Sequence, residues 1–210
     1  PYSGQSRSWH HELRDNNRDI ISIGKLHFKN NEKANGFSKE ILPLHVKDGK
    51  GWIHGLLRER TDLFDASSFA ANIGPGEDPY TNYDRKVCQL TQEWLTENGI
   101  RNPHGGWCLF VSFLRPHYPL TCPSEFYELY DPKRLPKPRQ ASDLPELEHP
   151  VLKNLKKSCD YDRSFTDDTR QIAIASYYGL CTFVDDLVGK INETLTKTSL
   201  DQTTNVLFTS

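Results

Sequence analysis

Several features that would define a protein class are missing from this sequence of 210 residues. It has no methionine, no run of roughly 18 apolar residues that could span a membrane, and no amino-terminal signal-peptide pattern. Its 26 basic and 28 acidic side chains are interspersed and give a net charge of −2. Because nucleic acids and anionic membranes attract basic surfaces, we expect neither as a partner. These features do not decide the oligomeric state or the compartment, which is cytoplasmic, periplasmic or secreted.

The cysteines exclude two further kinds of site. Five are present, an odd number, and they are scattered from Cys88 to Cys181 without a C-x-x-C pair. A zinc site or a disulfide framework is therefore not expected, and we interpret the cysteines as free thiols, several of them buried. Cys122 is not expected to be a nucleophile, because the neighbouring Glu125 disfavours a thiolate.

The two ends of the chain indicate a piece of a longer protein. The sequence opens on Pro1 and closes on Val206-Leu207-Phe208, an apolar run that is typical of a core strand. We therefore expect further sequence on both sides, so that the missing signal peptide says little about export.

What is present is an alternation of helical and strand patterns. Residues 28–79 lack a sustained period and predict a loop-rich insertion, and residues 131–150 predict a proline-rich connector. The whole pattern predicts an α/β fold, a single domain with a mainly parallel central sheet and flanking helices. The expected order is helix 8–16, strand 19–23, helix 83–98, strand 107–113, short helix 124–130, long helix 166–196 and strand 204–209.

The first candidate site is Gly24-Lys25-Leu26-His27, which follows the predicted strand 19–23. In α/β folds, sites gather at the carboxyl ends of the strands. A lysine cation and a titratable imidazole two positions apart suit an anionic substrate. The alternative is a solvated lysine beside an ordinary loop histidine.

The second candidate site follows the predicted strand 107–113 and contains His117. Pro116 and Pro119 restrict the backbone on both sides of this histidine, and a catalytic or anion-binding histidine needs such rigid placement. Arg115 is a candidate substrate-binding cation in the same segment. The alternative is a surface turn that only ends the strand.

The insertion contributes candidates for binding the rest of the substrate, namely His45, Trp52 and His54. An aromatic side chain there could stack on a sugar or hold a quaternary ammonium group, or Trp52 could only pack the loop. The adjacent Asp185 and Asp186 are not expected to bind a metal, because neighbouring positions on a helix point about 100° apart. No metal ligand is therefore assigned within the chain.

Taken in order, these segments resemble the sulfatase family of the alkaline phosphatase superfamily, and choline-sulfatase-like members in particular. Residues 22–28, with Gly36-Phe37 downstream, resemble the family's G-K-x-H segment, and residues 110–117 resemble its V-S-F-x-x-P-H strand end. Residues 177–189 and 205–210 resemble the helix and strand that lead to its carboxyl-terminal metal motif. The resemblance spans nearly the whole chain and implies the central part of one sulfatase catalytic domain, an incomplete alkaline-phosphatase-like fold.

The resemblance implies hydrolysis of a small sulfate monoester by a formylglycine hydrate beside calcium or a similar divalent ion. By this similarity, Lys25 and His27 would contact the sulfate and assist the leaving group, and His117 would hold a sulfate oxygen or donate the leaving-group proton. The formylglycine is made from the Cys or Ser of C/S-x-P-x-R, a motif that does not occur in this sequence. The formylglycine and the metal ligands are therefore expected outside this chain.

Two alternatives stay open beside a sulfate-ester hydrolase. One is a phosphonate or phosphodiester hydrolase of the same superfamily, because sulfate and phosphate esters present similar tetrahedral oxygens. The other is a non-catalytic relative that keeps an anion-binding pocket.

We expect the 210 residues to be inactive in isolation, because the nucleophile and metal ligands are not among them. An arylsulfatase assay on the purified piece checks this expectation. Measurable turnover by the piece alone would contradict it.

Overall fold

The computed structural model describes residues 1–30, 35–51, 67–101, 106–137, 150–151 and 164–210. The chain divides into two compact units, and each is described by itself. The first unit contains residues Pro1–Leu56, Asn82–Leu114 and Asp185–Ser210, and the second contains Leu57–Thr81 and Arg115–Val184. Helices α3 (Pro79–Trp94) and α6 (Asp167–Lys197) contribute residues to both units.

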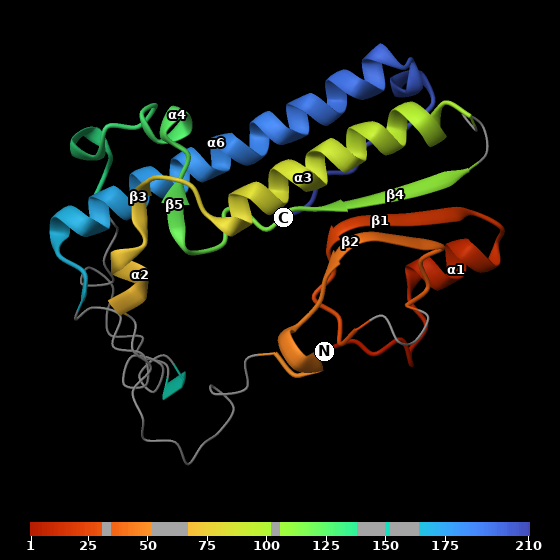
Figure 1. Ribbon diagram of the computed structural model, residues 1–210, viewed down its shortest axis with the longest axis horizontal. Helices are drawn as coiled ribbons and strands as arrows, with labels where there is room; N and C mark the ends of the chain where they lie inside the picture. Colours follow the sequence, from red (N-terminus) through yellow and green to blue (C-terminus); the bar gives the residue numbers. More distant parts are fainter. Residues whose placement is uncertain (31–34, 52–66, 102–105, 138–149, 152–163) are drawn as a thin grey trace. The chain divides into compact units, whose positions relative to one another are not determined.

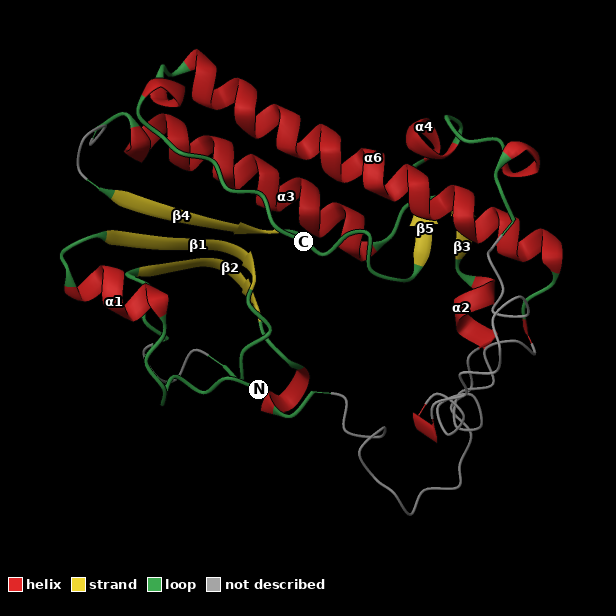
Figure 2. Cartoon of the chain, turned by 180° about the vertical axis from the view of Figure 1, so that it is seen from behind, coloured by secondary structure: helices red, strands yellow, loops and turns green. Residues whose placement is uncertain are grey.

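The first unit is built on a three-stranded parallel sheet with the order β2-β1-β4 (Figures 1 and 2). This arrangement confirms the predicted α/β class with parallel strands. The elements of this unit, besides its parts of α3 and α6, are α1 (Trp9–Asp15), β1 (Asp19–Lys25), β2 (Lys39–Leu44), the short helices η1 (Lys47–Gly49), η3 (Leu95–Gly99) and η7 (Leu200–Gln202), and β4 (Trp107–Ser112).

The core of the first unit forms where α3 and the end of α6 cover one face of the sheet. Ile21 and Ile23 of the central strand β1 pack there, and the removal of each such side chain from water contributes about 1.5–3 kcal/mol. On α3 the apolar positions recur at helical spacing, which is why one stripe of this helix is buried. The buried residues of this cluster are Ile21, Ile23, Val87, Trp94, Leu95, Leu195 and Leu200.

The central strand β1 ends in a tight approach to its neighbour β4. Gly24 is paired with Ser112 of β4, and its φ of +107° lies in the region that favours glycine. A Cβ atom on Gly24 would lie 2.2 Å from the Ser112 carbonyl oxygen, so no side chain fits. The register with β2 also shifts between Ile23 and Lys25, which redirects the chain after the strand.

Strand β2 lies in residues 28–79, which the sequence predicts as a loop-rich insertion, and the sequence pattern did not indicate this strand. The strand is half-buried and contains Pro43, which cannot donate a ladder hydrogen bond. A proline is tolerated because β2 is at the edge of the described sheet, and it also hides the strand from pattern analysis. The insertion contains further elements as well, namely α2 (Ser67–Ala71) and β3 (Ile73–Pro75).

The second unit contains a two-stranded parallel sheet of β3 and β5. Ser176 of α6 links this sheet to the helix, because its hydroxyl accepts a 2.9 Å hydrogen bond from the Gly74 amide. The prediction of a short helix after Pro123 is confirmed, although the helix is shorter than expected. Besides α2, β3 and its parts of α3 and α6, this unit contains β5 (Leu120–Cys122), α4 (Ser124–Tyr127) and η4 (Pro132–Arg134).

The predicted carboxyl-terminal strand at 204–209 is wrong. The segment has no strand pairing, and Val206, Leu207 and Phe208 are exposed, with Leu207 at 90%. A strand needs a paired neighbour for its backbone groups, and no strand pairs with this segment among the described residues. Strand β4 is half-buried along its whole length, and β1 is its only partner in the described sheet.

Helix α6 confirms the predicted long helix and is long and apolar enough by itself to cross a membrane. Its contacts are those of a core helix in a folded domain. The Leu187 carbonyl accepts a hydrogen bond from the Cys88 thiol, and Gln171 donates to the carbonyls of Pro132 and Leu135. Asp185 and Asp186 also place two carboxyl groups in the middle of this helix.

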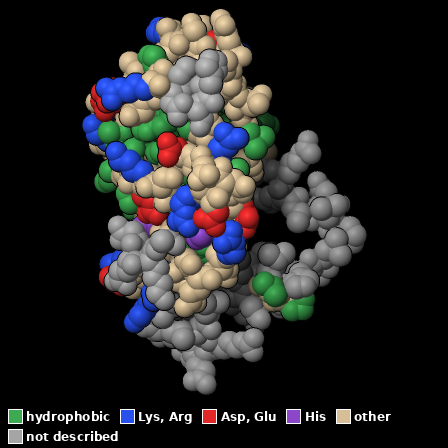
Figure 3. Space-filling view, turned by 90° about the vertical axis from the view of Figure 1, so that its right-hand side faces the viewer, with side chains coloured by type: hydrophobic (Ala, Val, Ile, Leu, Met, Phe, Trp, Pro, Cys, Tyr) green, Lys and Arg blue, Asp and Glu red, His purple; other side chains and the backbone are tan. Residues whose placement is uncertain are grey.

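One face of the molecule carries interspersed charges of both signs (Figure 3).

We predict that Gly24→Ala destabilises the protein by about 3 kcal/mol or more, because the added methyl meets backbone and the residue keeps a positive φ. Urea denaturation measures this loss. Gly189→Ala in α6 is the control, because nothing lies within 4 Å of its Cβ position. We expect the control to be neutral or stabilising by about 0.5–1 kcal/mol. Equal stability of the two variants would contradict the packing argument.

Candidate functional site

A pocket of about 420 Å³ lies at the carboxyl end of β1 in the first unit. It brings together Lys25 and His27, two of the residues that the sequence predicts as catalytic. Lys25 is half-buried and His27 is exposed, so both can meet a ligand. The residues that line the pocket are Trp9, His10, Lys25, Leu26, His27, Phe28, Phe37, Phe110, Ser112 and Phe113.

The backbone after β1 is held by the neighbouring strand β2. The carbonyl oxygen of Leu44 accepts hydrogen bonds from the amides of Leu26 and His27, at 3.1 and 2.8 Å. His27 has a φ of +57°, a conformation that non-glycine residues seldom adopt. Such a conformation persists where the surroundings determine it, and it is enriched at functional sites. The shared Leu44 carbonyl therefore sets the direction in which His27 leaves the strand.

Aromatic rings form one side of this pocket. Phe37 lies 6.1 Å from Trp9 and 6.2 Å from Phe110, measured between ring centroids. The imidazole of His10 stacks on Phe37 at 4.4 Å. The sequence does not predict Phe37 or Phe110 as site residues.

His10 is a pocket residue that sequence analysis missed. It is 3% exposed, and neither ring nitrogen has a hydrogen-bond partner within ordinary distance and angle among the described residues. Burial lowers the pKa of His10, and the neighbouring His11 acts in the same direction. The only signal in the sequence is the tandem His10-His11 on a short helix directly before the buried strand.

His45 lies next to the pocket but does not line it. Its ring stacks on Phe28 at 6.4 Å, and its Nε2 atom lies 3.6 Å from a carboxylate oxygen of Glu40. The predicted contact of His45 with the substrate stays a prediction. Trp52 and His54, the other two candidates from the insertion, lie outside the described residues.

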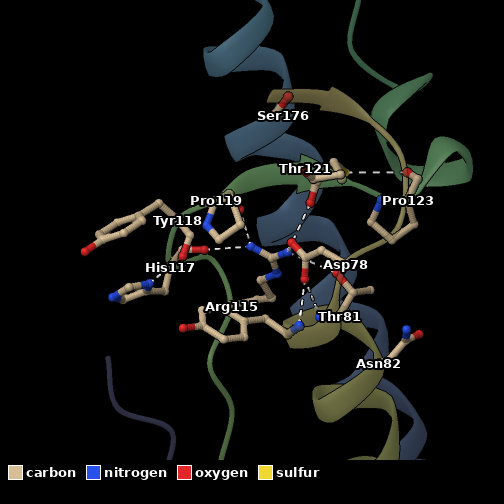
Figure 4. A network of polar contacts seen from close by, with 12 residues as sticks. Asp78, Thr81, Asn82, Arg115, His117, Tyr118, Pro119, Thr121, Pro123 and Ser176 are labelled. Carbon is tan, nitrogen blue, oxygen red and sulfur yellow. Dashed lines mark hydrogen bonds and ion pairs between the residues drawn. The ribbon is translucent and has the colours of Figure 1, made fainter. Parts of the chain in front are cut away.

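His117 lies in the second unit, in the loop between β4 and β5, and is exposed (Figure 4). Its Nδ1 atom lies 2.6 Å from the carbonyl oxygen of Tyr118. A carbonyl can only accept, so Nδ1 must carry the hydrogen of this bond, and Nε2 is the nitrogen left to act on a substrate. The ring also stacks on Tyr118 at 4.3 Å, and Tyr80 lies 6.0 Å away.

Arg115 lies in the same unit, and its contacts differ from those of a residue that faces a ligand. The residue is 4% exposed, and its guanidinium pairs with Asp78 and donates to the carbonyl of His117 at 2.7 Å (Figure 4). The sequence predicts a substrate-binding role for Arg115, whereas the described partners of its guanidinium are all internal to the unit.

The described residues do not form the divalent-ion or formylglycine site that the resemblance implies. No three His, Cys, Asp or Glu side chains come together as a metal site within the described ranges. Asp185 is exposed, and Asp186 pairs with Lys190 at 2.5 Å. Cys122 is fully buried, and burial raises the pKa of its thiol to about 12, as expected for a structural cysteine.

The sequence profile of the sulfatase family matches residues 16–210, which is most of the chain. The chain belongs to the sulfatase family. It is 26% identical over 218 aligned residues to a choline-sulfatase of Rhizobium meliloti (strain 1021), covering all of this chain and 42% of that protein.

Among solved structures, the chain is similar to the phosphonate monoester hydrolase SpPMH from Silicibacter pomeroyi. The TM-score is 0.60 at 20% identity, and the similarity covers 95% of this chain and 46% of the other. This likeness supports the alkaline-phosphatase-like fold. The chain spans less than half the length of these relatives.

The buried His10 predicts how stability depends on pH. Because its pKa is lowered in the folded state, the unfolded chain takes up the proton first as the pH falls. The contribution of neutral His10 is complete above the unfolded pKa of about 6.5 and is lost as the pH falls from there through the folded pKa. His10→Phe should therefore lose less stability between pH 7.5 and pH 5.5 than the unchanged protein. Urea denaturation at both pH values measures this, and equal losses would contradict it.

Proposed function

We propose that the full-length protein hydrolyses a sulfate monoester, with Lys25, His27 and His117 acting on the sulfate group. The observation that carries this proposal is the convergence of Lys25 and His27 on one pocket at the carboxyl end of β1. Membership of the sulfatase family supports it. The choline-sulfatase relative supports a small alcohol as the leaving group.

The chemistry of the ester gives each side chain a task. Cleavage of the sulfur–oxygen bond to the alcohol places negative charge on the leaving oxygen, and the ammonium group of Lys25 stabilises such charge. An alkoxide is a poor leaving group and needs a proton, which the imidazolium form of His27, or that of His117 through its Nε2–H, supplies. In this family a formylglycine hydrate and a divalent ion provide the nucleophile, and we expect both from sequence outside this chain.

Hydrolysis of a phosphonate monoester is the second candidate function. The fold is shared with a phosphonate monoester hydrolase, and a lysine with a histidine suits the tetrahedral oxygens of either group. Parallel assays of the full-length protein on a sulfate monoester and a phosphonate monoester with the same alcohol separate the two candidates. The larger kcat/KM identifies the preferred group.

We predict that Lys25→Met, His27→Gln and His117→Gln each lower kcat/KM for the preferred ester by about 100-fold or more, as the loss of one charge-stabilising or proton-donating group does. Steady-state kinetics of the full-length protein measures the effect. Lys29→Met is the control, because Lys29 is an exposed lysine near the site that does not line the pocket. A Lys25 variant as active as the Lys29 variant would contradict the proposed role of the pocket.

A further inference from the structure

The guanidinium of Arg115 lies inside the loop that carries His117 (Figure 4). It donates to the carbonyl oxygens of His117 at 2.7 Å and Thr121 at 3.2 Å, and to that of Pro119. Two of these carbonyls belong to the loop, and that of Thr121 belongs to β5. One side chain therefore binds three backbone carbonyls of the segment that leads from β4 into β5.

The same guanidinium is fastened to the first turn of α3. It pairs with the carboxylate of Asp78 and donates to the Thr81 hydroxyl at 3.2 Å. Asp78 also caps α3, because its other oxygen accepts from the amides of Tyr80 and Thr81 at 2.7 and 3.0 Å. Through Arg115, the loop is therefore bonded to Asp78 and Thr81 at the start of this helix.

Arg115 remains a cation in this place. Burial lowers the pKa of Arg115 to about 10, which still leaves the group charged at neutral pH. Asp78 compensates the charge, and the Tyr80 ring lies 5.8 Å from the guanidinium carbon. A buried ion pair is costly to form unless further hydrogen bonds satisfy both partners, and here the Arg115 guanidinium is bound by several acceptors in fixed directions.

The carbonyls that Arg115 holds flank the carbonyl of Tyr118, which orients the imidazole of His117. The His117 carbonyl is bound by Arg115, and the next carbonyl, that of Tyr118, accepts from His117 Nδ1. We infer that Arg115, with Asp78, is a positioning residue that holds His117 with Nε2 presented to the substrate. This inference rests on the proposed function only for the identity of the reaction.

Arg115→Lys in the full-length enzyme tests the inference. Lysine keeps the charge, but it lacks the planar fork that reaches several acceptors in fixed directions, so the loop should lose its single geometry. We measure kcat and KM for an alkyl sulfate, which has a poor leaving group, and for 4-nitrophenyl sulfate, which has a good one. Arg134→Lys is the control, because Arg134 is an exposed arginine of the same unit.

We expect Arg115→Lys to lower kcat by about 10–100-fold on the ester that His117→Gln impairs most, with little change in KM, because misplacement of a proton donor costs part of its effect. In the His117→Gln background the same change should have almost no further effect on kcat. A pattern of loss across the two esters that differs from that of His117→Gln, or full additivity with His117→Gln, would overturn the inference. Thr81→Val removes one contact of Arg115 and no charge, so it should lower kcat in the same pattern across the two esters, but by a smaller factor. A different pattern would also count against the inference.

A second measurement does not depend on activity. In protein labelled with ¹⁵N-histidine, the ring shifts of His117 should report hydrogen on Nδ1, and Arg115→Lys should convert this signal to a mixture of both tautomers. An unchanged His117 signal would overturn the positioning role. If the protein without substitutions does not hydrolyse sulfate esters, only the proposed function is overturned. The comparison of His117 tautomers still tests the role of Arg115.

Discussion

The contact between Gly24 of β1 and Ser112 of β4 is the constraint on which the described pocket depends. The two backbones approach so closely that no Cβ fits at position 24, and the chain therefore turns out of the strand at this point. The register shift beside β2 and the shared Leu44 carbonyl then direct Lys25 and His27 to the same pocket. Parallel pairing makes this possible, because neighbouring strands end at the same edge of the sheet.

A polar side chain is buried in each unit, and the two side chains differ in charge. In the first unit, His10 is buried against Phe37, and its lowered pKa keeps the imidazole neutral among aromatic rings. In the second unit, Arg115 is buried and charged, and Asp78 and backbone carbonyls compensate the charge. A neutral imidazole tolerates an apolar wall, whereas a guanidinium must be paired and hydrogen-bonded. Each unit therefore places a polar group beneath a loop or pocket without leaving an uncompensated charge.

Sequence analysis predicted the helices α1, α3 and α6 and the strands β1 and β4, because their apolar patterns are continuous and long. It missed β2, whose Pro43 and half-buried residues give no alternating pattern. It also predicted a strand at 204–209 from apolar residues alone, although a strand requires a partner for its backbone. Lys25, His27 and His117 were selected from their positions after predicted strands, and their catalytic roles remain a proposal.

The sequence by itself determined the family, the α/β class and the two strand-end segments with their histidines, because these depend on local order and short motifs. Only the tertiary structure decided what surrounds those segments. The stacking of His10 on Phe37 joins a helix to a loop, and the pairing of Arg115 with Asp78 joins residues 37 positions apart. Neither contact leaves a periodic signal, because burial and charge compensation arise between segments that meet only when the chain is folded.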